Sequence, residues 1–202
     1  MAPLARDVAA GSIESFLARL ADASPTPAGG AAVALATATA AALVAMVARV
    51  ALARTDEAPL RDIADAADRA RRQALALVSE DAEAYAAVVA ARRTRDGRDA
   101  AFAAALTRAT EAPLAVARTS GMLLDLAAAL APRARPATRS DLGVAVALAH
   151  ASLHGAAQTA RANLHDVADG GFVERVEAEL ARIVETGDAA RARVQASVGA
   201  AS

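Results

Sequence analysis

The chain of 202 residues contains neither cysteine nor lysine, and all 22 of its basic residues are arginine. Without cysteine the protein cannot form a disulfide bond, bind a metal through thiolates or use a thiol nucleophile. Without lysine it cannot form a Schiff base or use a catalytic lysine. These two absences exclude several large classes of enzyme mechanism.

Aromatic residues are also scarce, at 2% of the chain, and 23 acidic residues bring the net charge to −1. This composition offers neither the basic surface nor the stacking platforms that nucleic-acid binding uses, so we predict no nucleic-acid partner. Hydrophobic residues make up 55% of the chain, and most of them are alanine. Because strands favour β-branched and aromatic side chains, the composition favours closely packed helices.

One stretch, Ala31–Ala48, is uncharged over eighteen residues and is long enough to raise the question of a membrane span. Alanine contributes little to insertion, Thr37 and Thr39 interrupt the stretch, and Arg49 follows it. We therefore predict a buried helix and no membrane partner. The first residues, MAPLARDVAAGSIES, lack the apolar core of a signal peptide, so we expect a cytoplasmic protein.

Helical periodicity runs through the chain, and no strand pattern or repeat competes with it. We predict an all-α, up-and-down bundle of long helices in one domain covering residues 1–202. The expected helices cover Ile13–Leu20 after an N-cap at Ser12, Gly30–Arg54, Pro59–Arg95, Arg98–Glu111, a segment that Pro113 begins or kinks and that reaches Leu130, a helix capped by Ser140 and Asp141 that reaches Leu164, and a last helix after Gly170-Gly171.

The helix predicted over Pro59–Arg95 has one acidic residue on its apolar face. Steps of three and four residues define this face, which consists of Ile63, Ala67, Ala70, Ala74, Leu77, position 81, Ala84 and Val88. Position 81 is Asp81, and Tyr85 follows one turn later. Because a buried, unpaired carboxylate is costly, three readings of Asp81 are open: a general base or cation-stabilising group, the partner of an arginine on another helix, or an acid that reaches water at the edge of this face.

The stretch before the second helix, Pro25-Thr26-Pro27-Ala28-Gly29-Gly30, is not expected to be helical throughout, because Pro27 disfavours α geometry in Thr26. Glycines at the start of a helix expose N–H groups that can bind an anion or a polar ring. An ordinary connector between helices explains the same residues.

All three histidines lie at or near the helix predicted to end at Leu164. His150 and His154 have the i, i+4 spacing of zinc ligands, but there is no HExxH motif and no obvious third ligand, so we expect no metal site. With His165 they suggest a solvated or subunit-contact face. On another side of the helix, Gly155, Thr159 and Asn163 follow one another at one-turn intervals, which suits either a ligand site or a close helix crossing.

Several of these segments together resemble the cyclodeaminase/cyclohydrolase family over about residues 12–190. The matching segments, in order, are SIESFLARLADASPTPAGGAAVALATATAAALVAMVA, DAEAYAAV, RDAAFAAALTRATEAP, SDLGVAVA and GAAQTARANLHDVADGGF. The family includes the cyclodeaminase half of formiminotransferase-cyclodeaminase and stand-alone bacterial methenyltetrahydrofolate cyclohydrolases. No single motif carries this resemblance; the set in this order does.

The resemblance implies an all-helical homodimer that acts on tetrahydrofolate derivatives, with Asp81 as the catalytic group and with no metal or redox cofactor. It implies that Pro25, Pro27, Gly29 and Gly30 approach the folate. It also implies polar contributions from Asp141 and Asn163, with Thr159 at a position where the family usually has a second asparagine.

Three differences from the family pattern leave alternatives open. The loop reads PTPAGGA where the family usually has P-x-P-G-G-G-S, Thr159 replaces an asparagine, and Ala134-Arg135 stand where G-N is usual. Loss of an amide that recognises a pterin edge weakens discrimination. The sequence is therefore compatible with a cyclohydrolase or cyclodeaminase, with a folate- or pterin-binding homologue whose catalysis is altered or lost, and with a helical interaction module.

Overall fold

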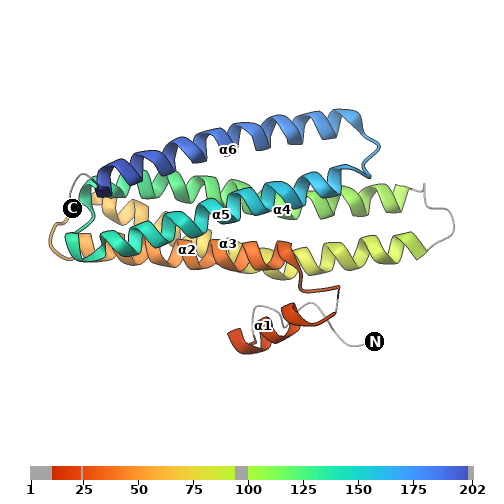
Figure 1. Cartoon of the computed structure of the whole chain (residues 1–202), viewed down its shortest axis with the longest axis horizontal. Coiled ribbons are helices and arrows are strands. Elements are labelled where there is room, and N and C mark those ends of the chain that lie inside the picture. The colour runs from red at the N-terminus through yellow and green to blue at the C-terminus, as the bar shows by residue number, and fades with distance from the viewer. Residues whose placement is uncertain (1–10, 24, 94–99, 200–202) are drawn as a thin grey trace.

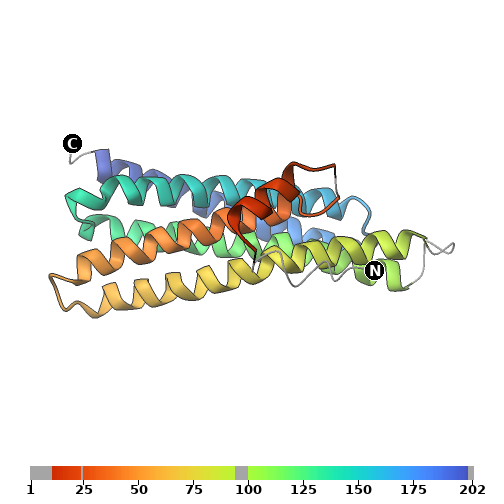
Figure 2. The ribbon, with the colours of Figure 1, turned by 90° about the horizontal axis from the view of Figure 1, so that it is seen from below.

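A computed structural model describes residues 11–23, 25–93 and 100–199. Its centre is an antiparallel pair of helices, α2 (Gly29–Leu52) and α3 (Ala58–Arg93), joined by a short turn. Figure 2 shows them side by side, with α3 continuing past the start of α2. Gly30 lies about as far before the end of α2 as Asp81 lies after the start of α3, so the pairing sets these two residues opposite each other.

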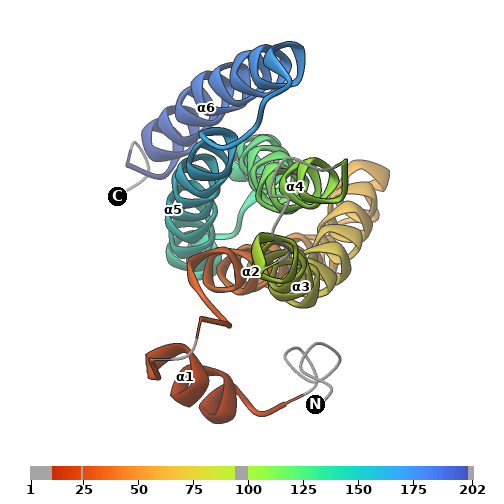
Figure 3. The ribbon, with the colours of Figure 1, turned by 90° about the vertical axis from the view of Figure 1, so that its right-hand side faces the viewer.

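The remaining long helices complete a bundle around this pair. They are α4 (Ala100–Leu130) and α5 (Arg139–Leu164), connected by the short 3₁₀ turns η1 (Ala131–Arg133) and η2 (Pro136–Thr138), and α6 (Gly170–Gly199). Seen end-on in Figure 3, α2, α3, α4 and α5 surround one centre, and α6 packs on the outside against α4 and α5. The short helix α1 (Ile13–Ala21) lies on the opposite side, beyond α2 (Figure 1). The described residues are helices, turns and bends without strands, which confirms the predicted all-α bundle.

Small residues allow the helices to approach closely. α2 buries twelve residues, and all but one glycine, two valines and Thr37 are alanine. α2 and α4 are each long and apolar enough by composition to cross a membrane, but more than half of the relevant window of each is buried inside the bundle. Core packing therefore accounts for the apolar length of both helices, as predicted for Ala31–Ala48.

The structure changes two helix boundaries. Residues 100–130 form one continuous helix with Pro113 in its interior, where we predicted two segments. Helix α5 begins at Arg139 with Thr138 as its N-cap, so Ser140 and Asp141 lie in its first turn and do not cap it. The N-cap at Ser12 is confirmed, because its side chain accepts a hydrogen bond from the Ser15 N–H. We predicted that one helix ends at Arg95 and the next begins at Arg98; both positions fall within residues 94–99, which lie outside the described residues.

Candidate functional site

A cavity of about 370 Å³ lies where the start of α2 meets the middle of α3, with the second half of α3, α4 and the end of α5 around it. Its polar lining comes from segments far apart in the sequence. The lining residues are Thr26, Ala28, Gly29, Gly30, Asp81, Tyr85, Val88, Val89, Arg92, Leu106, Ala109, Thr159, Ala162, Asn163 and Asp166. Its volume falls in the range of pockets that bind small molecules.

Asp81 projects from α3 toward the first turn of α2. The backbone N–H of Ala31 donates a hydrogen bond to its carboxylate. The N-cap residue of α2, Ala28, has no side chain that can cap, so Asp81 satisfies this end of the helix from a neighbouring helix. The partial positive charge of the helix start favours the ionised carboxylate.

Gly30 allows this approach. A Cβ atom built on Gly30 would lie 2.1 Å from Oδ1 and 2.5 Å from Cγ of Asp81, whereas one on Gly29 would have nothing within 4 Å. Neither glycine has a positive φ, so closeness to Asp81, and not backbone conformation, requires glycine at position 30.

Burial raises the pKa of the Asp81 carboxyl above its ordinary value of 3.8, and the hydrogen bond from Ala31 opposes this rise only in part. Among the described residues, the ion pairs of α3 involve other acids, such as Asp68 with Arg49 and Arg71. The alternative of an arginine partner for Asp81 therefore finds no support in this part of the chain. A desolvated carboxylate with a raised pKa is suited to move a proton or to stabilise a buried cation.

Asn163 has a structural partner as well as a place at the cavity. Because Pro113 lacks an N–H, it cannot donate to the Ala109 carbonyl one turn before it in α4. The Asn163 side-chain amide donates to this carbonyl at 2.6 Å from α5. This bond uses one of the two side-chain N–H groups of Asn163 and fixes the side chain, which leaves the other N–H as a donor and the oxygen as an acceptor for a ligand.

The line of Gly155, Thr159 and Asn163 serves both purposes that the sequence left open. Gly155 lies where α5 crosses α2, since a Cβ on Gly155 would be 2.8 Å from Cγ1 of Val33 on α2. Thr159 and Asn163, further along α5, line the cavity. The Thr159 hydroxyl donates to the Gly155 carbonyl at 3.0 Å, so it too faces a ligand as an acceptor.

The comparisons with known proteins agree with this architecture. Residues 12–182 match the family model described as formiminotransferase-cyclodeaminase. The chain belongs to the formiminotransferase-cyclodeaminase family. A methenyltetrahydrofolate cyclohydrolase of Methylorubrum extorquens is 34% identical over 198 residues, covering 93% of this chain and 95% of the relative. The crystal structure of a formiminotetrahydrofolate cyclodeaminase from Thermotoga maritima superposes with a TM-score of 0.87 at 26% identity, covering 94% of this chain and 96% of the other.

Not every residue expected from this family lies at the cavity. Gly29, Gly30, Asp81, Thr159 and Asn163 do. Asp141 does not, because it lies in the first turn of α5, about 33 Å along the helix from Asn163. Pro25 is exposed and Pro27 is buried, and neither lines the cavity although their neighbours Thr26 and Ala28 do.

The departures from the family pattern divide in the same way. Ala28 and Thr159 line the cavity, whereas Ala134 and Arg135 lie with Asp141 at the far end of α5. Ala31 acts through its backbone N–H, which serine and alanine provide equally. The change at position 31 therefore preserves the hydrogen bond to Asp81.

The sequence pattern missed two charged residues at the cavity. Arg92 of α3 pairs with Asp166, just after α5, and both line the cavity. Spacing offered a signal for Arg92, since it follows Tyr85 and Val88 on one side of α3. Its pairing with Asp166 could not be read from the sequence, because it depends on the packing of α3 against the end of α5.

Proposed function

We propose that this protein is an enzyme of one-carbon folate metabolism, acting on a C–N bond of the bridge between N5 and N10 of tetrahydrofolate. The observation that carries the proposal is the half-buried Asp81 carboxylate, held at the start of α2 by the Ala31 N–H and facing a cavity of about 370 Å³. The relative from Methylorubrum extorquens and the structure from Thermotoga maritima bear names of two reactions at this bridge.

The substrate carbon of such a reaction carries amidinium-like positive charge between two nitrogens. The Asp81 carboxylate, largely removed from water, can stabilise this cation more strongly than an exposed acid. In the hydrolytic direction, water adds to the bridging carbon and Asp81 accepts a proton from it. The C–N5 bond then breaks, Asp81 returns that proton to N5, and the hydroxyl on the former bridging carbon releases the second water proton to solvent as it becomes the formyl carbonyl of 10-formyltetrahydrofolate.

The same carboxyl fits the deaminating reaction. There N10 attacks the carbon of the protonated formimino group and gives its proton to Asp81; Asp81 passes this proton to the departing nitrogen, ammonia leaves, and the methenyl compound forms. Of the two reactions we propose the cyclohydrolase, whose named relative is 34% identical over almost the whole chain, with the cyclodeaminase as the second candidate.

The rest of the cavity suits a flat, amphipathic ligand. Val88, Leu106 and Ala162 provide apolar walls, and the oxygens of Thr159 and Asn163 provide acceptors on one side. Tyr85 lines the same cavity with 45% of its surface exposed, which leaves its ring accessible at the mouth. We propose that Thr159 and Asn163 accept hydrogen bonds from the pterin and that Tyr85 contacts its face.

The test is to add the protein to 5,10-methenyltetrahydrofolate and to follow the loss of its absorbance, in parallel with formation of the same absorbance from 5-formimidoyltetrahydrofolate. We expect methenyl loss well above the uncatalysed rate, unaffected by EDTA because the proposed reaction uses no metal. If neither reaction exceeds the uncatalysed rate but folate raises the melting temperature, the protein is a folate-binding homologue without catalysis. If folate has no effect on either quantity, the folate proposal fails and a helical interaction module remains.

We further propose a cytoplasmic homodimer. Ile13 and Leu17 of α1 are 71% and 52% exposed, although Phe16 between them is buried. A short helix with apolar side chains on its outer side is suited to a contact with a second copy. Light scattering on the wild type and on a variant with Ile13→Ser and Leu17→Ser tests this; a wild type that stays monomeric at micromolar concentration contradicts it.

A further inference from the structure

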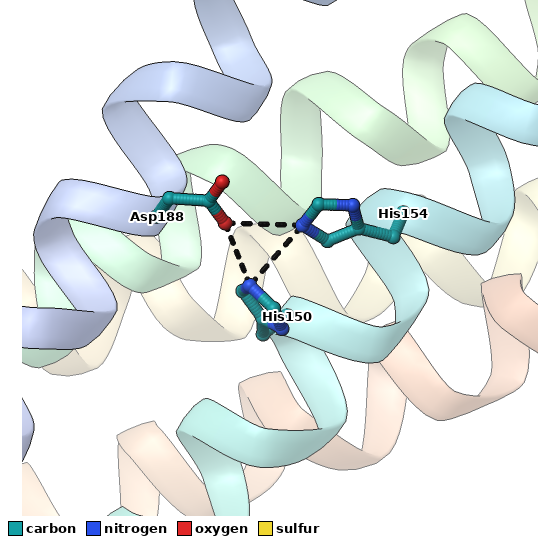
Figure 4. A group of neighbouring side chains, drawn as sticks. All are labelled: His150, His154 and Asp188. Carbon is teal, nitrogen blue, oxygen red and sulfur yellow. Dashed lines mark hydrogen bonds and ion pairs between the residues drawn. The ribbon is translucent and has the colours of Figure 1, made fainter.

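Two histidines of α5 and one aspartate of α6 converge outside the cavity that Asp81 lines. Nε2 of His150 lies 2.7 Å from Oδ1 of Asp188, and Nε2 of His154 lies 3.0 Å from the same oxygen. The two Nε2 atoms are 3.1 Å apart. Figure 4 shows all three side chains directed at one point between the helices.

Hydrogen bonds alone do not satisfy this triangle of atoms. If both histidines carry a proton on Nε2, each can donate to Asp188, but the two N–H groups then face each other. If only one Nε2 is protonated, the other presents its lone pair to the Asp188 oxygen. At most two of the three contacts can be favourable in any protonation state, whereas a cation between the atoms makes all three attractive.

The triangle also has the dimensions of a metal site. A point about 2.1 Å from all three atoms exists, about 1.2 Å out of their plane, and 2.0–2.2 Å is the usual distance of zinc from imidazole nitrogen and carboxylate oxygen. Two imidazoles and one carboxylate are a donor set for zinc and neighbouring first-row metals, and less suited to calcium or magnesium.

The surroundings hold the ligands in place and leave the site open. Gly187 precedes Asp188 in α6, and a Cβ there would lie 2.5 Å from Cδ2 of Leu153 and 3.1 Å from Cδ1 of Leu124. This close packing brings α6 within reach of the α5 histidines. The side chains of His150, His154 and Asp188 are 21%, 40% and 50% exposed, so an ion can enter and keep a water ligand.

We infer that His150, His154 and Asp188 form a binding site for a divalent first-row transition metal such as Zn²⁺, linking α5 to α6. The sequence led us to expect no metal because the histidine pair lacked a third ligand, and the packing of α6 supplies one. The metal stabilises the attachment of the outer helix, because it binds the folded arrangement and not the separated helices. This inference is independent of the proposed folate reaction, whose groups lie elsewhere.

The experiment uses untagged full-length protein treated with EDTA and dialysed, titrated with ZnCl₂ by calorimetry and with CoCl₂ by visible absorption. We expect one equivalent of either metal per chain, Co²⁺ bands typical of nitrogen and oxygen ligands, and a higher melting temperature with Zn²⁺. His154→Ala and Asp188→Asn should each weaken binding at least about tenfold and remove most of the melting-temperature rise. His165→Ala, which changes the histidine outside the cluster, should leave both unchanged.

The outcomes that overturn the inference are equally defined. A wild-type protein that binds no Zn²⁺ or Co²⁺ overturns it whatever the variants do, as does binding that persists unchanged in both His154→Ala and Asp188→Asn. Circular dichroism of each variant establishes that its helices are intact. If a variant fails to fold, the imidazole NMR signals of the wild type decide: those of His150 and His154, and not of His165, should shift with one equivalent of Zn²⁺, and unshifted signals overturn the site.

Discussion

Two aspartates of this bundle have opposite environments. Asp81 lies on the packing face of α3, and burial raises the pKa of its carboxyl. Its carboxylate accepts a hydrogen bond from the backbone N–H of Ala31. Asp188 lies on α6 with half of its side chain exposed, and hydrogen bonds from His154 and then His150 lower its pKa. The fold therefore disfavours the charged form of the Asp81 carboxyl by removing it from water, and favours the charged form of the Asp188 carboxyl by hydrogen bonding.

The difference follows from what each helix places opposite the carboxylate. Asp81 faces the start of α2, where Gly29 and Gly30 have no side chain that could pair with its carboxylate. Its charge therefore stays available to a ligand that enters the cavity. Asp188 faces two side chains that can donate hydrogen bonds or share a metal. Perturbed carboxylates in cavities are candidates for catalysis, whereas paired ones are more often structural, which is why we assign the chemistry to Asp81.

Among the variants that leave both aspartates in place, the largest effect on this comparison is expected from Gly30→Ala. The added methyl group would lie within 2.6 Å of three atoms of the Asp81 carboxylate, so the side chain must move from its position at α2. A displacement of about 1 Å at a reacting group costs on the order of 100-fold in rate. Turnover of the methenyl compound, measured with the absorbance assay, should fall by this order.

Gly29→Ala is the matched control for the fold, because a Cβ at position 29 meets no atom within 4 Å. We expect its free energy of unfolding to equal or slightly exceed that of the wild type, since alanine is the better helix former. Gly30→Ala should lose about 1–3 kcal/mol by urea denaturation. Equal stabilities and equal rates for the two variants would show that Asp81 does not need the space above Gly30.

The next effect concerns how the cavity is built. Asn163→Ala removes the donor to the Ala109 carbonyl that Pro113 leaves without a helical partner, so we expect a loss of about 1–3 kcal/mol in the free energy of unfolding. In a Pro113→Ala background, the N–H at position 113 can take over the carbonyl. The cost of Asn163→Ala should then be clearly smaller, and a double-mutant cycle of urea denaturation measures the difference. Two additive substitutions would mean that Asn163 does not serve this carbonyl.

The sequence predicted most of the fold because helices repeat a simple pattern. The apolar stripe of α3 is buried as its spacing requires, and Asp81 is the acid that interrupts it. The antiparallel register of Gly30 and Asp81 could also have been derived from the short turn between α2 and α3. Pairings between distant helices could not: Asn163 with Ala109, Arg92 with Asp166, and Asp188 with the histidines depend on helix rotation and crossing angle.

Pro113 marks a wrongly predicted helix boundary, whereas Asp141 remains a site prediction that the structure of one chain does not test. A proline inside a helix is costly in isolation, but here tertiary packing keeps α4 continuous and Asn163 satisfies the freed carbonyl. Asp141 entered the predicted site through the resemblance, and its place in the first turn of α5 puts it at the opposite end of that helix from Asn163. Its contribution to folate binding stays a prediction that the cavity of one chain does not support.

The smallest effects are expected in stability against pH. Because the pKa of Asp81 is raised on folding, the folded state binds the extra proton more readily, and stability falls as the pH rises past 3.8 toward the folded pKa. Asp81→Asn cannot ionise, so it should be more stable than the wild type near neutral pH, by on the order of 1 kcal/mol, with the advantage fading at acid pH.

The opposite sign is expected for Asp188. Its pKa is lowered on folding, so its contribution to stability is present above 3.8 and is lost as the pH falls toward the folded pKa. Asp188→Asn should therefore be less stable than the wild type near neutral pH, with the deficit fading at acid pH. Thermal denaturation of both variants in EDTA across this pH range measures the two signs, and the same sign for both would refute the contrast between the two sites.

The most direct test of the catalytic assignment is the steady-state rate of methenyltetrahydrofolate hydrolysis by the wild type, Asp81→Asn and Glu83→Gln, each at saturating substrate. Glu83 is the control, because it is an exposed acid two residues along the same helix. We predict a loss of about 100-fold or more for Asp81→Asn, with folate still raising its melting temperature, and a wild-type rate for Glu83→Gln. An Asp81→Asn protein that keeps the wild-type rate would contradict the assignment.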